Sequence, residues 1–387
     1  MSFNCMGGQT VRSETSLGVC WITVRKVSDL CSTTTLALAN GIIEAGHNLT
    51  FLNPDEIHKH EPYPWMQHEL HRSLRKGFQA TSIAKSAMKW FDKHTTHGFD
   101  MILVDWQLAK KLVPYFQKRG LPMILMDRSP PADASLFGRL QWHHWKKAWR
   151  HVQSGKVSRG CVVSLAHREF VQKKFSIPSE QIHILPAGVD LIRFKPNLKA
   201  SIESKILLVY HGRLDKHRGI LALPMLVQKL QNRNIDARLT IIGEGDALKD
   251  LENMSRKFPW LKIHSKMQQE SLAKILSVQH VGLLPMPNSK VWSLASPLKR
   301  SEYLASGLLV FGIKHEGHNL QNTQTSWFNL VEQYDFHVLG IDWIQSLNNE
   351  IFNQGSRLAR EYAEKFCSWT EAIKELESAI QFARDAS

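Results

Sequence analysis

Short apolar runs rich in β-branched residues alternate along this chain with segments of helical apolar spacing, and this alternation limits the possible folds more than any other feature. Continuous apolar runs are typical of parallel strands that are buried on both faces. Strands that alternate with helices predict parallel sheets with right-handed crossovers. A first series has expected strands at residues 19–24, 48–52, 101–104, 123–126, 161–164 and 182–185, and helices at 33–45 and 82–93.

After a polar stretch at residues 197–204, the alternation begins again. The second series has expected strands at 206–210, 239–242, 262–265, 281–285 and 308–312, and helices at 220–231 and 269–277. A chain of 387 residues exceeds what one core usually serves. We therefore expect an α/β protein of two doubly wound domains, residues 18–198 and 199–365, with a ligand site in the cleft facing the strand ends. Residues 1–17 are polar and are expected to be a disordered tail.

The charge balance favours an anionic partner. Lysine and arginine number 49 against 35 aspartate and glutamate, a net charge of +14. Nucleotide phosphates, lipid head groups and nucleic acid all fit that excess. The sequence contains no nucleic-acid recognition motif, so nucleic acid is the least favoured of the three.

The five cysteines are scattered and form no C-x-x-C pair: Cys5, Cys20, Cys31, Cys161 and Cys367. This pattern predicts neither a disulfide framework nor a zinc site, and it fits a reducing cytoplasm. No apolar run approaches the roughly 20 residues of a membrane span, and the first residues lack a secretory h-region.

Four histidines follow the second expected strand without a clear i,i+4 ligand pair: His58, His60, His68 and His71. We expect a solvated loop there, and no bound metal.

Residues 296–307 have the features of an anion-binding helix start. Ser296 can cap the first turn, and Pro297 suits the first helical position. Gly307 suits the end of the helix. The N–H groups of Leu298 and Lys299 then lie at the positive end of the helix, which favours an anion.

Glu302 lies about 7.5 Å along the helix axis from Pro297. A diphosphate at the helix start and a ribose diol at Glu302 would fit one nucleotide sugar. The alternative is a capped surface helix with a Lys299–Glu302 pair.

A basic loop follows the expected strand 206–210. Gly212 allows close approach to the backbone, and Arg213 and Arg218 could grip a diphosphate through charge-assisted hydrogen bonds. Taken alone, a basic surface loop is the simpler interpretation.

Five segments, in this order, resemble those of the retaining glycosyltransferases of family 4. They are residues 184–190 (ILPAGVD) with 194–196 (FKP), 212–214 (GRL), 241–246 (IIGEGD), 296–307 (SPLKRSEYLASG) and 366–369 (FCSW). Order and spacing agree over residues 182–369, whereas before residue 182 only the strand–helix pattern agrees.

The resemblance implies the GT-B fold, in which two Rossmann-like domains face a central cleft. The first domain would bind the acceptor and the second the nucleotide-sugar donor, with a helix in residues 366–387 crossing back to the first domain. The implied reaction is sugar transfer with retention of configuration and without a metal cofactor. The implied acceptor is a sugar, a lipid-linked intermediate or a polysaccharide precursor.

By position, Arg213 matches the arginine that binds the donor diphosphate. Arg218 stands where the family has a lysine, and Lys216 is a neighbouring alternative. Glu302 matches the glutamate that binds the ribose hydroxyls, whereas the family's earlier glutamate is replaced by Leu294. That replacement supports a second hypothesis, a nucleotide-sugar-binding protein of the same fold without catalysis. The remaining donor-binding positions are Gly212, Gly243, Ser296, Pro297, Leu298 and Lys299.

The segment after the expected strand 123–126 occupies the place from which family members point a residue at the reacting sugar. Asp127 is the catalytic candidate there, and Arg128 is a candidate for an acceptor phosphate. Asp105, at the end of the preceding strand, is a further candidate. The alternative is a structural Asp–Arg turn.

Trp142, Trp145 and Trp149 share one face of an expected helix, because they lie three and four residues apart. Lys146 and other basic residues edge this face. Such a face suits a membrane interface and a lipid-linked acceptor, with the protein peripheral on the inner side of the membrane. The alternative is that the tryptophans belong to the core of the first domain.

Overall fold

The structure is a computed structural model that describes residues 16–29, 32–56, 63–75, 77–94, 98–131, 136–197, 202, 204–320 and 325–385, without the side chains of 136–139. Most of the expected tail, together with His58 and His60, lies outside the described residues. Leu17 is described and buried, and its N–H donates to Nδ1 of His47 at 3.3 Å. The N-terminal lobe therefore includes Leu17, one residue before the expected boundary.

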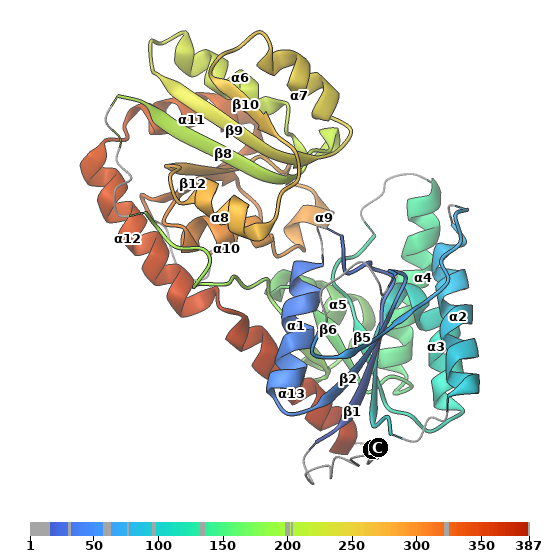
Figure 1. Cartoon of the computed structure of the whole chain (residues 1–387). Coiled ribbons are helices and arrows are strands. Elements are labelled where there is room, and N and C mark those ends of the chain that lie inside the picture. Colours follow the sequence, from blue (N-terminus) through green and yellow to red (C-terminus); the bar gives the residue numbers. More distant parts are fainter. Residues whose placement is uncertain are drawn as a thin grey trace, which may run out of the picture.

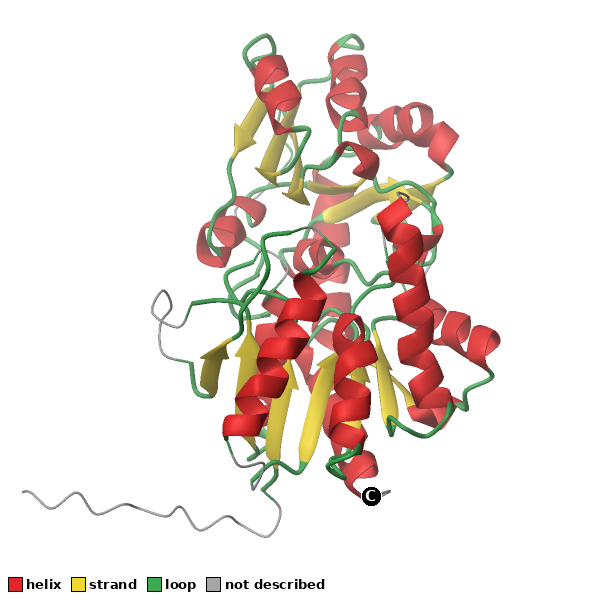
Figure 2. Ribbon diagram, turned by 90° about the vertical axis from the view of Figure 1, so that its right-hand side faces the viewer, coloured by secondary structure: helices red, strands yellow, loops and turns green. Residues whose placement is uncertain are grey.

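Two parallel sheets, one in each half of the chain, form two lobes that lie one above the other (Figure 1). Figure 2 shows the helices in red on the faces of both yellow sheets. The sheet of the N-terminal lobe has the order β3-β2-β1-β4-β5-β6-β7. Its strands are β1 Gly18–Ile22, β2 Asn48–Asn53, β3 Met66–Glu69, β4 Met101–Asp105, β5 Met123–Met126, β6 Arg159–Val162 and β7 Ile182–Ile184.

The helices of the N-terminal lobe enclose two cores, one on each face of its sheet. They are α1 Thr33–Glu44, α2 Gln79–Lys93, α3 Trp106–Gln117, α4 Leu136–Gln153 and α5 Leu165–Phe175. Side chains of α2, α3, α4 and α5 pack together on one face, and those of α1 pack on the other.

The sheet of the C-terminal lobe has the order β10-β9-β8-β11-β12-β13. Its strands are β8 Ile206–Arg213, β9 Ala237–Glu244, β10 Leu261–His264, β11 Val281–Leu284, β12 Leu309–Ile313 and β13 Phe328–Val331. Its helices are α6 Ala222–Gln231, α7 Leu248–Ser255, α8 Gln269–Leu276, α9 Lys290–Ser293, α10 Leu298–Ala305, α11 Phe336–Gln345 and α12 Asn349–Phe366. The predicted class of two doubly wound parallel sheets is confirmed.

The last helix, α13 (Trp369–Asp385), returns to the N-terminal lobe (Figure 1). Leu376 and Ile380 pack in the same core as Val19 and Leu38. Between α12 and α13, the carbonyl of Cys367 accepts the N–H of Val189 at 2.7 Å. The two lobes are thus joined twice by the chain. None of the helices in the described part of the chain is long and apolar enough to cross a membrane.

The strand β3 lies where the sequence indicated only a polar excursion. Its four residues are exposed or half-buried at the sheet edge, so its sequence has no apolar run that would predict a strand. The strands β8 and β9 also extend further than expected, to Arg213 and Glu244, because their hydrogen-bonded pairing continues. This extension places the predicted loop glycines within the ladder.

Candidate functional site

Two glycines face each other where β8 and β9 end. Gly212 pairs with Gly243 in the parallel register, and both have positive φ, +119° and +148°. Glycine adopts these values readily, whereas other residues do so at a cost. A Cβ on Gly243 would overlap the carbonyl oxygen of Gly212. The main chain of Gly212 and Gly243, without side chains, therefore forms one surface of the site, which we call the glycine floor.

Two arginines stand beside this floor and share one carboxylate. Nη2 of Arg213 lies 3.2 Å from Oδ1 of Asp215, and Nε of Arg218 lies 3.2 Å from Oδ2. Arg213 also contacts Glu244 at 3.5 Å. Burial raises the pKa of Asp215, but the two arginines outweigh burial and hold the pKa below its ordinary value. The ionised carboxylate brings both guanidinium groups together.

Lys299 adds a third cation, in a way that the sequence did not indicate. Its side chain is buried, and a Cβ on Gly212 would lie 3.5 Å from its Nζ. The ammonium also lies 5.0 Å from the ring centroid of Tyr210. The sequence assigned only the main chain of Lys299 to phosphate, because nothing local shows which way its side chain turns.

Lys216 is held by the next helix instead. Its Nζ lies 2.8 Å from Oδ2 of Asp250 on α7, which raises the pKa of Lys216. Its N–H donates to Oδ1 of Asp246 at 2.7 Å. Lys216 thus fixes the turn that carries Arg218, and Arg218 is the cation that joins Arg213.

The helix α10 begins close to the expected residue, but its first turn is not capped as predicted. Pro297 is its N-cap residue, and no side chain caps the first turn. The predicted capping role of Ser296 is wrong, because its Oγ accepts the N–H of Ala187 at 3.1 Å. Ser301 Oγ donates to the carbonyl of the same Ala187 at 3.1 Å. The main chain of Ala187, in the segment between the lobes, therefore binds both hydroxyls. In the first turn of α10, the side chain of Lys299 reaches Gly212.

Glu302 is buried in α10, 2% exposed, and faces β8. Its Oε2 lies 3.1 Å from Nε2 of His211, which is also buried. Sequence reasoning missed His211. The available signal was an imidazole in an otherwise apolar strand, immediately before Gly212.

The short helix α9 closes the site from the side. The ring of Trp292 lies 4.4 Å from the guanidinium of Arg218 and stacks on His217. Leu294 is buried, and its carbonyl accepts Ser164 Oγ of the N-terminal lobe at 2.9 Å. The position of the family's absent glutamate therefore has a buried apolar side chain, and its main chain contacts the N-terminal lobe.

Comparisons with known proteins agree with this fold. Residues 31–193 match the model of the family described as Glycosyltransferase Family 4. Sucrose-phosphate synthase from Thermosynechococcus elongatus aligns with a TM-score of 0.76 and 15% identity, over 96% of this chain and 100% of that one. WaaG, a glycosyltransferase involved in lipopolysaccharide biosynthesis, aligns with a TM-score of 0.70 and 12% identity, over 92% and 98%. Anabaena Alr3699/HepE, in complex with UDP-glucose, aligns with a TM-score of 0.69 and 9% identity, over 94% and 99%. No curated protein sequence matches the chain significantly.

The chain has the GT-B fold, and its N-terminal lobe is similar to the glycosyltransferases of family 4. The family match falls on the N-terminal lobe, where the sequence showed only a strand–helix pattern. The motif resemblance falls mainly on the C-terminal lobe. The two kinds of similarity are therefore complementary.

The side chain of Asp127 does not reach the surface of the protein. It is fully buried, and its Oδ2 accepts the indole N–H groups of Trp145 at 2.5 Å and Trp149 at 2.8 Å. Nε2 of His167 lies 3.2 Å away. The predicted contact between Asp127 and the sugar is wrong, because α4 and α5 enclose the carboxylate.

The tryptophan face is part of the core. Trp145 and Trp149 are fully buried, so the membrane-facing interpretation is wrong for both. Trp142 is half-buried and packs edge-on against Trp145, with ring centroids 5.2 Å apart. Lys146 and Arg128 are both half-buried.

Asp105 is also structural. Its Oδ2 accepts the hydroxyl of Thr23 at 2.6 Å and the N–H of Val24 at 3.1 Å. Burial raises the pKa of this carboxyl. It holds the loop after β1.

Among the described residues, no three His, Cys, Asp or Glu side chains gather as metal ligands. His68 instead packs against Trp90, with ring centroids 4.9 Å apart.

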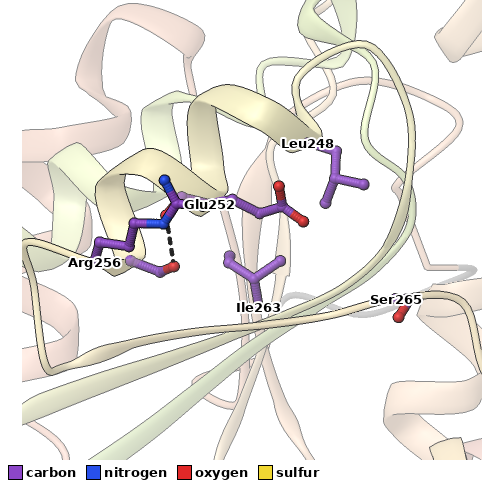
Figure 3. A pocket seen from close by; sticks show the side chains of 6 residues that line it. Leu248, Glu252, Arg256, Ile263 and Ser265 are labelled. Carbon is purple, nitrogen blue, oxygen red and sulfur yellow. Dashed lines mark hydrogen bonds between the residues drawn. The ribbon is translucent and has the colours of Figure 1, made fainter.

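A separate hollow of about 320 Å³ lies between α7 and β10 (Figure 3). Leu248 and Glu252 of the helix and Ile263 of the strand border it. It contains none of the predicted site residues, so we assign it no role in the reaction.

Proposed function

We propose that this protein transfers a sugar from a nucleotide-sugar donor to an acceptor, with retention of anomeric configuration. One observation carries the proposal. Arg213, Arg218 and Lys299 gather around the Gly212–Gly243 floor where α10 begins, and Glu302 follows on that helix. This arrangement suits a diphosphate beside the floor and a ribose diol at Glu302. Solved structures of the same fold support the donor class: one contains UDP-glucose, and a pneumococcal O-GlcNAc transferase contains UDP and GlcNAc.

The chemistry that the site can supply is electrostatic. Breaking the anomeric C–O bond leaves negative charge on the departing diphosphate. Fixed positive groups aimed at that charge lower the barrier, because they need no reorganisation during the reaction. Arg213, Arg218 and Lys299 provide three such groups, and the start of α10 adds its dipole. We expect transfer to continue in EDTA.

Retention and acceptor class rest on the motif resemblance. We propose that the N-terminal lobe binds the acceptor, a sugar, a lipid-linked intermediate or a polysaccharide precursor. With Trp145 and Trp149 buried, the net charge of +14 is the remaining support for an anionic membrane partner. Product analysis by proton NMR tests retention, since the anomeric coupling distinguishes the two configurations.

The first experiment is a thermal-shift screen of nucleotide sugars, because a ligand that binds the native state raises the melting temperature. The best donor is then used in a transfer assay with the Glu302→Ala variant. We expect a severe loss of turnover while the variant remains folded. Near-normal turnover would remove Glu302 from the donor site.

A second candidate function is nucleotide-sugar binding without catalysis. The buried apolar Leu294, whose carbonyl contacts the N-terminal lobe, favours it, because the sugar ring loses a carboxylate partner there. Donor binding without hydrolysis or transfer, across a broad panel of acceptors, would support this candidate.

A further inference from the structure

One buried contact in the donor site has no assigned role. Nε2 of His211, on β8, lies 3.1 Å from Oε2 of Glu302, on α10, and the two side chains are 9% and 3% exposed. The contact joins the strand that carries the glycine floor to the helix whose start faces it. It therefore lies where the position of the Glu302 carboxylate would matter to a ligand.

Tyr303 also limits the position of the imidazole, through the main chain and through the ring of His211. The main-chain N–H of His211 donates to the hydroxyl of Tyr303 at 3.2 Å. The ring stands perpendicular to the Tyr303 ring, with centroids 5.2 Å apart. Tyr303 itself is fully buried, and a Cβ on Gly282 would overlap its ring. This close packing leaves the imidazole little room to turn.

The His211–Glu302 contact is close, but its hydrogen bonding is incomplete. Nε2 of His211 and Oε2 of Glu302 are both buried, and neither completes a directed hydrogen bond among the described residues. A buried carboxylate oxygen without such a bond is costly unless a ligand supplies a donor. A hydroxyl group of a ligand is a donor of the required kind.

We propose that His211 is the positioning residue for the Glu302 carboxylate, the group to which the proposed function assigns the vicinal diol of the donor ribose. This inference rests on the proposed function. The imidazole lies against Oε2 and limits where the carboxylate can lie, while the diol donates to the carboxylate. Lys299, three residues before Glu302 and beside the glycine floor, would lie toward the diphosphate of the same donor.

The test compares ribonucleotides with their 2′,3′-dideoxy counterparts. Isothermal titration with UDP, GDP and ADP first identifies the nucleotide that binds best. The wild-type protein is expected to prefer that nucleotide over its dideoxy form by about 10-fold or more, the usual effect of hydrogen bonds to a charged group. In His211→Phe, the ratio of the affinity for the ribonucleotide to that for its dideoxy form should fall close to one. The affinity for inorganic pyrophosphate should be unchanged.

Two further variants separate positioning from a structural role. His211→Gln has an amide nitrogen that can approach Glu302, and it should restore most of the ratio. His211→Asn is too short for the contact and serves as a second loss variant if His211→Phe does not fold. The matched control is His280→Phe, another buried imidazole in the same sheet, on the N-terminal side of β11. It should keep the wild-type ratio.

A wild-type ratio in His211→Phe or His211→Asn would overturn the proposal, as would a wild-type protein that binds both nucleotide forms equally. In either case nucleotide binding itself would stand, and the proposed function with it. Failure of every nucleotide, every nucleotide sugar and pyrophosphate to bind would instead overturn the proposed function, and this inference with it.

Discussion

The two lobes use charged residues differently at the carboxyl ends of their parallel strands. Asp127 directly follows β5 in the N-terminal lobe, and Arg213 ends β8 in the C-terminal lobe. Asp127 is fully buried under two indoles, whereas the side chain of Arg213 is 42% exposed. A charged residue at the carboxyl end of a parallel strand is therefore not a site by position alone. Its role depends on whether the next helices enclose it.

The enclosing elements explain the difference. In the N-terminal lobe, α4 places Trp145 and Trp149 over the strand end, and their N–H groups bind the carboxylate. In the C-terminal lobe, Asp215 binds Arg213 and Arg218 from the side. The Asp127 contacts thus hold α4 against the sheet of the N-terminal lobe. The Asp215 contacts orient two cations and leave them accessible.

The largest expected effect is on the stability of the N-terminal lobe. Asp127→Ala should lower the free energy of unfolding by about 3–5 kcal/mol, because two buried indoles and His167 lose their shared partner. Urea unfolding followed by tryptophan fluorescence measures this loss. Asp127→Asn, which keeps an acceptor oxygen, should lose less. If Asp127→Ala were as stable as the wild type yet inactive, the comparison between the lobes would fail.

Arg213→Ala should show the opposite pattern. We expect turnover to fall about 100-fold or more, because one fixed donor to the leaving diphosphate is lost. The free energy of unfolding should change by less than about 0.5 kcal/mol, as for most partly exposed positions. Steady-state kinetics and urea unfolding test both parts. Arg238→Ala, an exposed arginine at the start of β9, is the matched control and should keep full activity.

A smaller effect is expected at Trp292, which contacts Arg218 through its ring. Trp292→Ala should raise the KM for the donor about three- to tenfold, the range of a partly exposed cation–π contact. Trp292→Phe should retain part of the interaction. An unchanged KM in Trp292→Ala would show that Asp215 alone orients Arg218.

The smallest effect concerns pH. The pKa of Asp215 is lowered in the folded protein, so its contribution to stability is present above its unfolded value, near 3.9. That contribution, less than about 1 kcal/mol, is lost as the pH falls through the folded value. Urea unfolding between pH 6 and pH 3 should therefore show a shallower loss in Asp215→Asn. Identical pH profiles would mean that the arginines do not depend on this carboxylate.

The sequence predicted which residues lie together around the glycine floor better than it predicted the surroundings of Asp127 and the tryptophans, for a local reason. Gly212, Arg213 and Arg218 lie within one short segment, so their proximity follows from chain geometry. His211 and Glu302 are 91 residues apart in the sequence, and only the packing of α10 against β8 brings them together. Ser296 was misjudged in the same way, because Ala187 competes for its hydroxyl.

The sequence by itself determined the architecture. Strands buried on both faces need continuous apolar runs, and the crossovers between parallel strands leave a helical pattern between those runs. It also determined which cations stand near the ends of β8 and β9. The tertiary structure alone decided that Asp127 is enclosed, that Lys299 turns toward Gly212 and that His211 faces Glu302. These outcomes depend on contacts between segments that are distant in the sequence. A local sequence pattern does not predict which side chain a neighbouring helix will cover.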